Sequence, residues 1–195
     1  MAKRNLLFLD IDGVLNNRAS LEACVQRAKK DGTGYTEFEG EMFQSRLDLP
    51  CVMRLNFLVE YGSFDVVLSS TWRMGRDYKV VSRYLRQVCG CEFDLIGATP
   101  ILGGSEVRGK EIEKWRVDEA QFRPFIIVDD DSDMDPHMDR LVKTKHEPGL
   151  TDNDVRKALS LIYRDEVQVQ KIGPLDEKLS ASWDAYNKLE EDYRK

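Results

Sequence analysis

Residues 6–15 constrain the fold of this chain more than any other segment. The run Leu6-Leu7-Phe8-Leu9 is wholly apolar, and Asp10-Ile11-Asp12-Gly13 follows it directly. A continuous apolar run is typical of a parallel strand that is buried on both faces. Asp10 and Asp12 are two residues apart, so on an extended chain their side chains share one side. The segment therefore predicts a buried strand that ends in paired carboxylates, an arrangement suited to a divalent cation and to phosphate chemistry.

Two later segments repeat this design. Phe64-Asp65-Val66-Val67-Leu68 runs into Ser69-Ser70, and Phe125-Ile126-Ile127-Val128 runs into Asp129-Asp130-Asp131-Ser132-Asp133. Ligands of open α/β sheets bind beyond the carboxyl ends of the strands, so we expect the three polar clusters to meet at one edge. One D-x-D sequence is weak evidence, but three matched strand ends indicate a single site.

Helical patterns separate these strands. Apolar residues recur at helical spacing from Pro50 to Gly62, before Gly90, over residues 109–120 and after Thr151-x-x-Asp154, which resembles a capping box. Short strands are predicted within residues 93–98 and at Leu141-Val142. Alternating strands and helices predict an α/β fold: a Rossmann-like parallel sheet with helices on both faces.

Two segments fall outside this alternation. Residues 16–49 are polar, contain glycines and show little periodicity. We expect a small insert that folds over the sheet edge, either as a functional lid or as a simple excursion. Residues 164–195 form a C-terminal extension after the domain of residues 1–163. Its apolar residues, spaced by three and four, predict an amphipathic helix that packs on the domain or, alternatively, forms a homodimer surface: Leu175, Leu179, Trp183, Tyr186, Leu189 and Tyr193.

Composition excludes several classes of protein. The chain has 195 residues, 42% hydrophobic and 33% charged, as in globular proteins rather than disordered ones. Its net charge of −6 argues against holding long nucleic acid by charge alone, although a local basic pocket for one end or one nucleotide is compatible. No signal peptide or membrane span is evident, so we expect a cytoplasmic protein without a membrane partner. With two histidines, the four cysteines favour free thiols over a zinc site.

The strand-end motifs resemble those of the haloacid dehalogenase (HAD) superfamily, which shares a Rossmann-like sheet and consists mostly of Mg²⁺-dependent phosphohydrolases. A narrower resemblance, over about residues 5–163, is to the HAD-like domains of "Swiss army knife" RNA repair proteins. Four segments carry it: Val67-Leu68-Ser69-Ser70-Thr71-Trp72-Arg73, Arg108-Gly109-Lys110-Glu111-Ile112 with Trp115, Ile127-Val128-Asp129-Asp130-Asp131-Ser132-Asp133-Met134, and Gly149-Leu150-Thr151.

The resemblance implies roles for the acidic residues. Asp10 matches the nucleophile that forms an aspartyl phosphate. Asp12 matches the general acid/base, which protonates the leaving alkoxide and later activates water. Mg²⁺ would bind Asp10, the backbone carbonyl of Asp12 and Asp130, with Asp129 and Asp133 as ligand neighbours or holders of metal-bound water.

For each phosphate-binding group, the resemblance leaves two candidate residues. Ser69 matches the hydroxyl that binds phosphate, and Ser70 is the alternate because the strand boundary is uncertain by a residue. Arg108 is the preferred basic clamp, since it begins the R-G-x-E-I run, and Lys110 is the alternate.

Trp72 and Arg73 directly follow the second strand and are candidate substrate residues. An indole can stack on a base and a guanidinium can hold a second phosphate. Alternatively, Trp72 belongs to the core and Arg73 to a surface ion pair. His137 is either a substrate contact or a solvent-facing loop residue.

These expectations combine into a Mg²⁺-dependent phosphomonoesterase with a fairly open site. The RNA-repair resemblance implies a phosphorylated nucleic-acid end as substrate. A free nucleotide or a small metabolite is the alternative, which the acidic net charge suits better. Non-enzymatic alternatives are a receiver-like signalling domain and an inactive phosphate-binding module. The acid Asp12 and the hydroxyls of Ser69 and Ser70 favour the phosphatase, because a stable phospho-switch has no use for a built-in acid/base.

Overall fold

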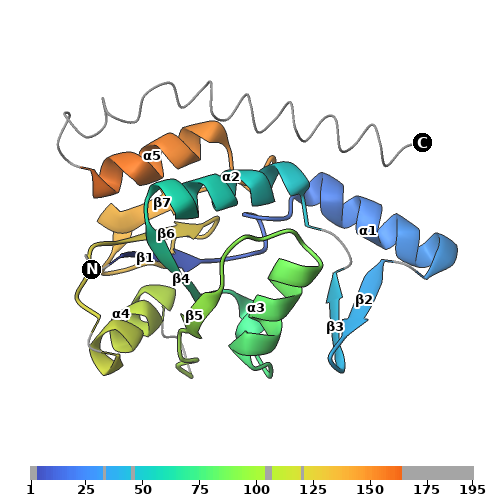
Figure 1. Ribbon diagram of the computed structural model, residues 1–195, viewed down its shortest axis with the longest axis horizontal. Helices are drawn as coiled ribbons and strands as arrows, with labels where there is room; N and C mark the ends of the chain where they lie inside the picture. Colours follow the sequence, from blue (N-terminus) through green and yellow to red (C-terminus); the bar gives the residue numbers. More distant parts are fainter. Residues whose placement is uncertain (1–3, 33, 45–46, 104–106, 120, 164–195) are drawn as a thin grey trace. The chain divides into compact units, whose positions relative to one another are not determined.

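A five-stranded parallel sheet forms the centre of the fold, shown in Figure 1 as a computed structural model. The structure describes residues 4–32, 34–44, 47–103, 107–119 and 121–163. The strand order is β5-β4-β1-β6-β7. The strands are β1 (Asn5–Leu9), β4 (Phe64–Leu68), β5 (Leu95–Ala98), β6 (Phe125–Asp129) and β7 (Leu141–Lys143).

Strand β1 occupies the middle of the sheet, between β4 and β6. Leu6, Leu7, Phe8 and Leu9 are completely buried, which explains why this run has no polar residue. Leu9 is in register with Leu68 of β4 and with Val128 of β6. The residues that follow these three therefore emerge side by side at the carboxyl edge of the sheet.

Helices cover both faces of the sheet, as predicted. In Figure 1, α2 (Leu49–Tyr61) and α5 (Asp152–Ile162) lie on one side, and α3 (Tyr78–Gln87) and α4 (Arg108–Asp118) lie on the other. Under α4, the ring of Phe8 makes edge-to-face contacts with Trp115 and Phe125, with centroids 5.5 and 5.8 Å apart. Short 3-10 turns span Thr71–Arg73 and Met138–Arg140.

Helix boundaries follow the local signals in the sequence. Asp48 caps α2 by accepting from the Cys51 N–H, and Gly62 ends that helix. At the start of α5, the Asp154 carboxylate accepts from the backbone and the hydroxyl of Thr151, so the predicted capping box forms with Asp in place of Glu.

The insert contains more regular structure than its sequence suggested. It forms α1 (Arg18–Asp31) and a hairpin of β2 (Tyr35–Phe38) and β3 (Glu41–Gln44). Cys24 is the one buried residue of α1, so the helix has no apolar stripe that its sequence could show. What specifies it is a reciprocal capping box between Asn17 and Ser20.

The hairpin of the insert packs against α3. The Phe43 ring stacks on the Tyr84 ring at 4.1 Å. Two ion pairs tie the same surfaces together, Arg76 with Glu41 and Arg83 with Glu39. The insert is therefore fixed to the sheet domain beside the carboxyl edge.

Within the described ranges, no helix combines the length and the apolar character needed to cross a membrane. The amphipathic helix expected in residues 164–195 lies outside the described residues.

Candidate active site

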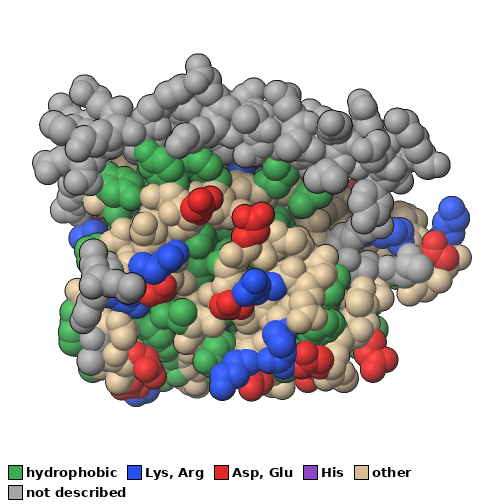
Figure 2. All heavy atoms as spheres, in the orientation of Figure 1, with side chains coloured by type: hydrophobic (Ala, Val, Ile, Leu, Met, Phe, Trp, Pro, Cys, Tyr) green, Lys and Arg blue, Asp and Glu red, His purple; other side chains and the backbone are tan. Residues whose placement is uncertain are grey.

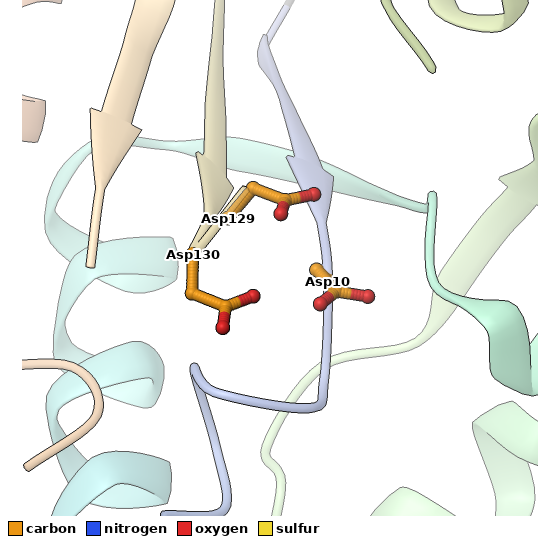
Figure 3. A group of neighbouring side chains, drawn as sticks. All are labelled: Asp10, Asp129 and Asp130. Atoms are coloured by element: carbon orange, nitrogen blue, oxygen red, sulfur yellow. The ribbon is translucent and has the colours of Figure 1, made fainter. Parts of the chain in front are cut away.

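Three carboxylates converge at the carboxyl ends of β1 and β6. Asp10 follows β1, Asp129 is the last residue of β6 and Asp130 follows it (Figure 3). Each offers an oxygen that lies within 4.8 Å of the other two. The sequence motifs of two strands separated by more than a hundred residues thus form one cluster.

The carboxylates of this cluster repel one another. Burial and the neighbouring charge of Asp129 raise the pKa of Asp10 to about 7. Arg108, the Ser70 hydroxyl and the Ile11 backbone N–H oppose this rise without cancelling it. Burial also raises the pKa of Asp129, against the lowering effect of Arg108. Concentrated negative charge of this kind is typical of a functional site rather than of a structural one.

The donor set fits a hard divalent cation. Carboxylate oxygens are the ligands that Mg²⁺ prefers, and Mg²⁺ commonly uses few protein ligands and keeps several waters. Asp10 and Asp129 are buried and Asp130 is partly exposed, so the cluster opens to solvent on one side. A bound cation would relieve the repulsion that raises the pKa of Asp10.

Arg108 contacts two of these carboxylates, Asp10 and Asp129. One guanidinium nitrogen lies 2.5 Å from Asp129 Oδ2 and 3.3 Å from Asp10 Oδ1. Arg108 is the first residue of α4, and its backbone N–H donates to Asp133. Lys110 is exposed and lies in an open depression lined by Glu113, Lys114, Val117, Asp118, Asp135 and Pro136.

The two serines after β4 differ in their contacts. The Ser70 hydroxyl donates to the Asp10 carboxylate and accepts weakly from the Trp72 backbone N–H. The Ser69 hydroxyl is fully buried and has no hydrogen-bond partner among the described residues. The geometry therefore places the alternate serine, Ser70, beside Asp10.

Asp12 lies outside the three-carboxylate cluster and is held separately. Its Oδ1 accepts from Asn16 Nδ2 at 2.6 Å, and its Oδ2 accepts from Trp72 Nε1 at 3.1 Å. Its side chain stays partly exposed. The two acids of the D-x-D motif thus have different surroundings.

Arg73 faces the protein interior instead of the solvent. Its guanidinium donates to the backbone carbonyls of Ser69, Ser70 and Thr99 and forms an ion pair with Glu111 of α4. These contacts bind the ends of β4 and β5 to α4. The expected exposed ion pair of Arg73 is thus a buried one, and all three of its guanidinium nitrogens bind protein groups.

Two other candidates lie apart from the cluster. Asp133 lies at the start of α4, with its Oδ2 accepting from the Arg108 N–H, and its oxygens are not among the three that converge. His137 pairs with Glu113 at 2.9 Å and packs on Phe125, at the start of β6 and therefore at the opposite end of that strand from Asp129.

The structure adds residues that sequence reasoning missed. His146, after β7, has its Nδ1 3.5 Å from Asp130 Oδ2. Thr144 donates its hydroxyl to the Gly13 carbonyl and so fixes the turn after β1. Both follow the short strand Leu141–Lys143. Polar residues after a parallel strand are candidates for the site, and this position therefore marks them. No sequence motif marks Asn16 as a site residue; only its hydrogen bond to Asp12 does.

Comparison with protein-family models matches residues 6–155 to the HAD domain in Swiss Army Knife RNA repair proteins. Comparisons with curated proteins and with solved structures found no match. The matched range spans more than half of the chain and includes every residue of the carboxylate cluster. The chain therefore belongs to the family of haloacid dehalogenase (HAD) domains found in Swiss Army Knife RNA repair proteins.

Proposed function

We propose that this protein is a Mg²⁺-dependent phosphomonoesterase that acts through an aspartyl phosphate on a phosphorylated nucleic-acid end. The observation that carries the proposal is the convergence of Asp10, Asp129 and Asp130 beside Arg108 and Ser70. A carboxylate nucleophile, a phosphate-neutralising cation and a hydroxyl donor are the groups that phosphoryl transfer needs in one place.

The first step forms the covalent intermediate. The Asp10 carboxylate attacks phosphorus, an acyl phosphate bond forms, and the phosphoester P–O bond breaks. Asp12 gives its proton to the departing alkoxide, so an alcohol leaves. The Ser70 hydroxyl turns its hydrogen from Asp10 to a phosphoryl oxygen, and Arg108 donates to the phosphoryl oxygens and neutralises part of their charge.

The second step regenerates the enzyme. Asp12, now a carboxylate, takes a proton from water as the water oxygen attacks phosphorus. The acyl phosphate bond breaks, Asp10 returns as a carboxylate, and inorganic phosphate leaves. When bound by Asp10, Asp130 and the Asp12 carbonyl, Mg²⁺ would neutralise the phosphoryl oxygens and allow Asp10 to be ionised.

Two observations support a nucleic-acid end as the substrate. The matching family is described by its occurrence in RNA repair proteins. On the face shown in Figure 2, the described acidic and basic side chains are interspersed. The described side chains of this face therefore form no continuous basic track for the backbone of a long strand, and contact with one terminal phosphate does not need such a track.

A panel of substrates tests the proposal. The purified protein is assayed with Mg²⁺ on 3′-phosphorylated RNA and DNA oligonucleotides, 5′-phosphorylated ones, mononucleotides and p-nitrophenyl phosphate. We expect kcat/KM to be highest for one class of oligonucleotide end and activity to disappear in Asp10→Asn. Equal rates on a mononucleotide and an oligonucleotide end would favour the free-nucleotide phosphatase, to which the net charge of −6 is better suited. Phosphate binding without turnover in the same panel would favour a binding or receiver-like module.

A further inference from the structure

The Asp12 carboxylate is held by donors from two distant parts of the chain. Asn16 comes from the same turn and binds Oδ1 at 2.6 Å, whereas Trp72 follows β4 and binds Oδ2 at 3.1 Å. Both carboxylate oxygens thus have a fixed donor, although the side chain is partly exposed. These two hydrogen bonds therefore hold the Asp12 carboxylate in one orientation, although a partly exposed side chain is usually free to rotate.

The indole of Trp72 is itself fixed on its other sides. It lies 5.6 Å from the Phe43 ring of the insert and 6.3 Å from the Tyr84 ring of α3, measured between centroids. Its exposed fraction is 9%, so little of the indole is left to stack on a nucleotide base. The ring has Phe43 and Tyr84 as tilted aromatic neighbours and donates its N–H to Asp12.

Proton transfer makes the orientation of Asp12 important. A general acid must lie within hydrogen-bond reach of the leaving oxygen, and a misplacement of about 1 Å can cost roughly a hundredfold in rate. A protonated carboxyl can still accept hydrogen bonds at its oxygens, so the Trp72 contact is compatible with both protonation states of Asp12.

We propose that Trp72 is a positioning residue that holds Asp12 where it protonates the leaving alkoxide, and that Phe43 of the insert holds the indole in turn. The proposal rests on the proposed phosphomonoesterase activity. It gives the insert a role in the chemistry, through the chain Phe43–Trp72–Asp12, in addition to covering the edge of the domain.

The leaving group of the substrate tests this role. An alkoxide is strongly basic and needs a proton to leave, whereas p-nitrophenolate leaves readily without one. For Trp72→Phe, which keeps an aromatic ring and removes the N–H donor, we expect kcat/KM on ethyl phosphate to fall about 10- to 100-fold. On p-nitrophenyl phosphate we expect a fall of at most about threefold, because proton donation contributes little there. The ratio kcat/KM reports the steps up to departure of the alcohol, so the later role of Asp12 as a base does not enter.

A matched substitution separates positioning from stability. Trp115→Phe makes the same chemical change in the core, beside Phe8, without contacting Asp12. Any fall in kcat/KM that Trp115→Phe causes should be the same for ethyl phosphate and for p-nitrophenyl phosphate. Phe43→Leu, which loosens the indole without touching Asp12, should give the substrate dependence of Trp72→Phe to a smaller extent.

A double-mutant cycle gives the decisive outcome. In an Asp12→Asn background, Trp72→Phe should have no further effect on ethyl phosphate, because the group it positions is gone. Additive effects in the cycle, or equal losses on the two substrates, would overturn the proposal while the phosphatase function stands. A wild-type protein inactive on every phosphomonoester with Mg²⁺ would instead overturn the proposed function, and this inference with it.

Discussion

Gly13 and Asp130 are in such close contact that no side chain fits between them. A Cβ atom on Gly13 would lie 2.3 Å from Asp130 Oδ2. Gly13 also has φ of 76°, in the left-handed region that favours glycine. The glycine of the D-x-D-G motif therefore allows the chain to turn and also allows a carboxylate from another strand end to reach the cluster.

Replacing Gly13 by alanine should weaken Mg²⁺ binding, because the methyl group displaces the Asp130 carboxylate. We expect at least a tenfold rise in the Kd for Mg²⁺, measured by calorimetric titration, together with loss of phosphatase activity. Gly32→Ala is the matched control, since Gly32 has the same φ of 76° and no atom within 4 Å of its Cβ position. Both variants should lose about 1 kcal/mol of stability from backbone strain. Unchanged Mg²⁺ affinity in Gly13→Ala would remove Asp130 from the ligand set.

The metal-free protein should lose stability as the pH rises from about 4 to about 7. Burial and Asp129 raise the pKa of Asp10 from 3.8 to about 7, so in this interval the folded state holds a proton that the unfolded state has released. Stability then falls with rising pH, by up to about 1.4 kcal/mol per pH unit for one proton. Urea unfolding in EDTA at several pH values measures this slope.

Asp10→Asn isolates the contribution of Asp10 to that slope. Asparagine does not titrate, so the difference in unfolding free energy between wild type and variant should favour the variant increasingly up to about pH 7. Saturating Mg²⁺ should abolish the dependence of this difference on pH, since the cation stabilises the ionised carboxylate of Asp10. A difference that is constant over this pH range would show that Asp10 titrates normally.

Arg108→Ala should lose activity and Lys110→Ala should keep it. Arg108 contacts Asp10 and Asp129, whereas Lys110, two residues later in the first turn of α4, is exposed. We expect roughly a 100-fold or larger fall in kcat/KM for Arg108→Ala, as for removal of a group that stabilises transition-state charge, and a change below about threefold for Lys110→Ala. Steady-state kinetics on p-nitrophenyl phosphate compares them directly. The reverse result would make Lys110 the clamp.

The buried ion pair of Arg73 and Glu111 should show strong energetic coupling. Either Arg73→Met or Glu111→Leu alone leaves a buried charge without its partner and should cost about 3 kcal/mol or more. The double variant should be less destabilised than the sum of the singles, because it removes both charges. Urea unfolding of the four proteins gives the coupling energy. Additive losses would show that each side chain acts through its backbone contacts alone.

Local sequence signals predicted most of the sheet domain. The apolar runs before Asp10, Ser69 and Asp129 specify strands that are buried on both faces, and parallel topology then brings their ends together. Pro50, Gly62 and the Thr151–Asp154 pair specify helix ends through local hydrogen bonding and backbone geometry. The helix α1 was missed because a helix that buries one residue has no apolar stripe to detect.

The sequence by itself determined the parallel sheet, its acidic edge and the carboxylates that meet there, because strand periodicity and strand-end position are local properties of the chain. Tertiary structure alone decided which neighbours each group has. It placed Arg108 rather than Lys110 on the carboxylates, turned Arg73 inward to Glu111 and directed the Trp72 N–H to Asp12. Those choices depend on how helices, loops and the insert pack around the edge, and contacts between residues far apart in the chain leave no periodic signal in the sequence.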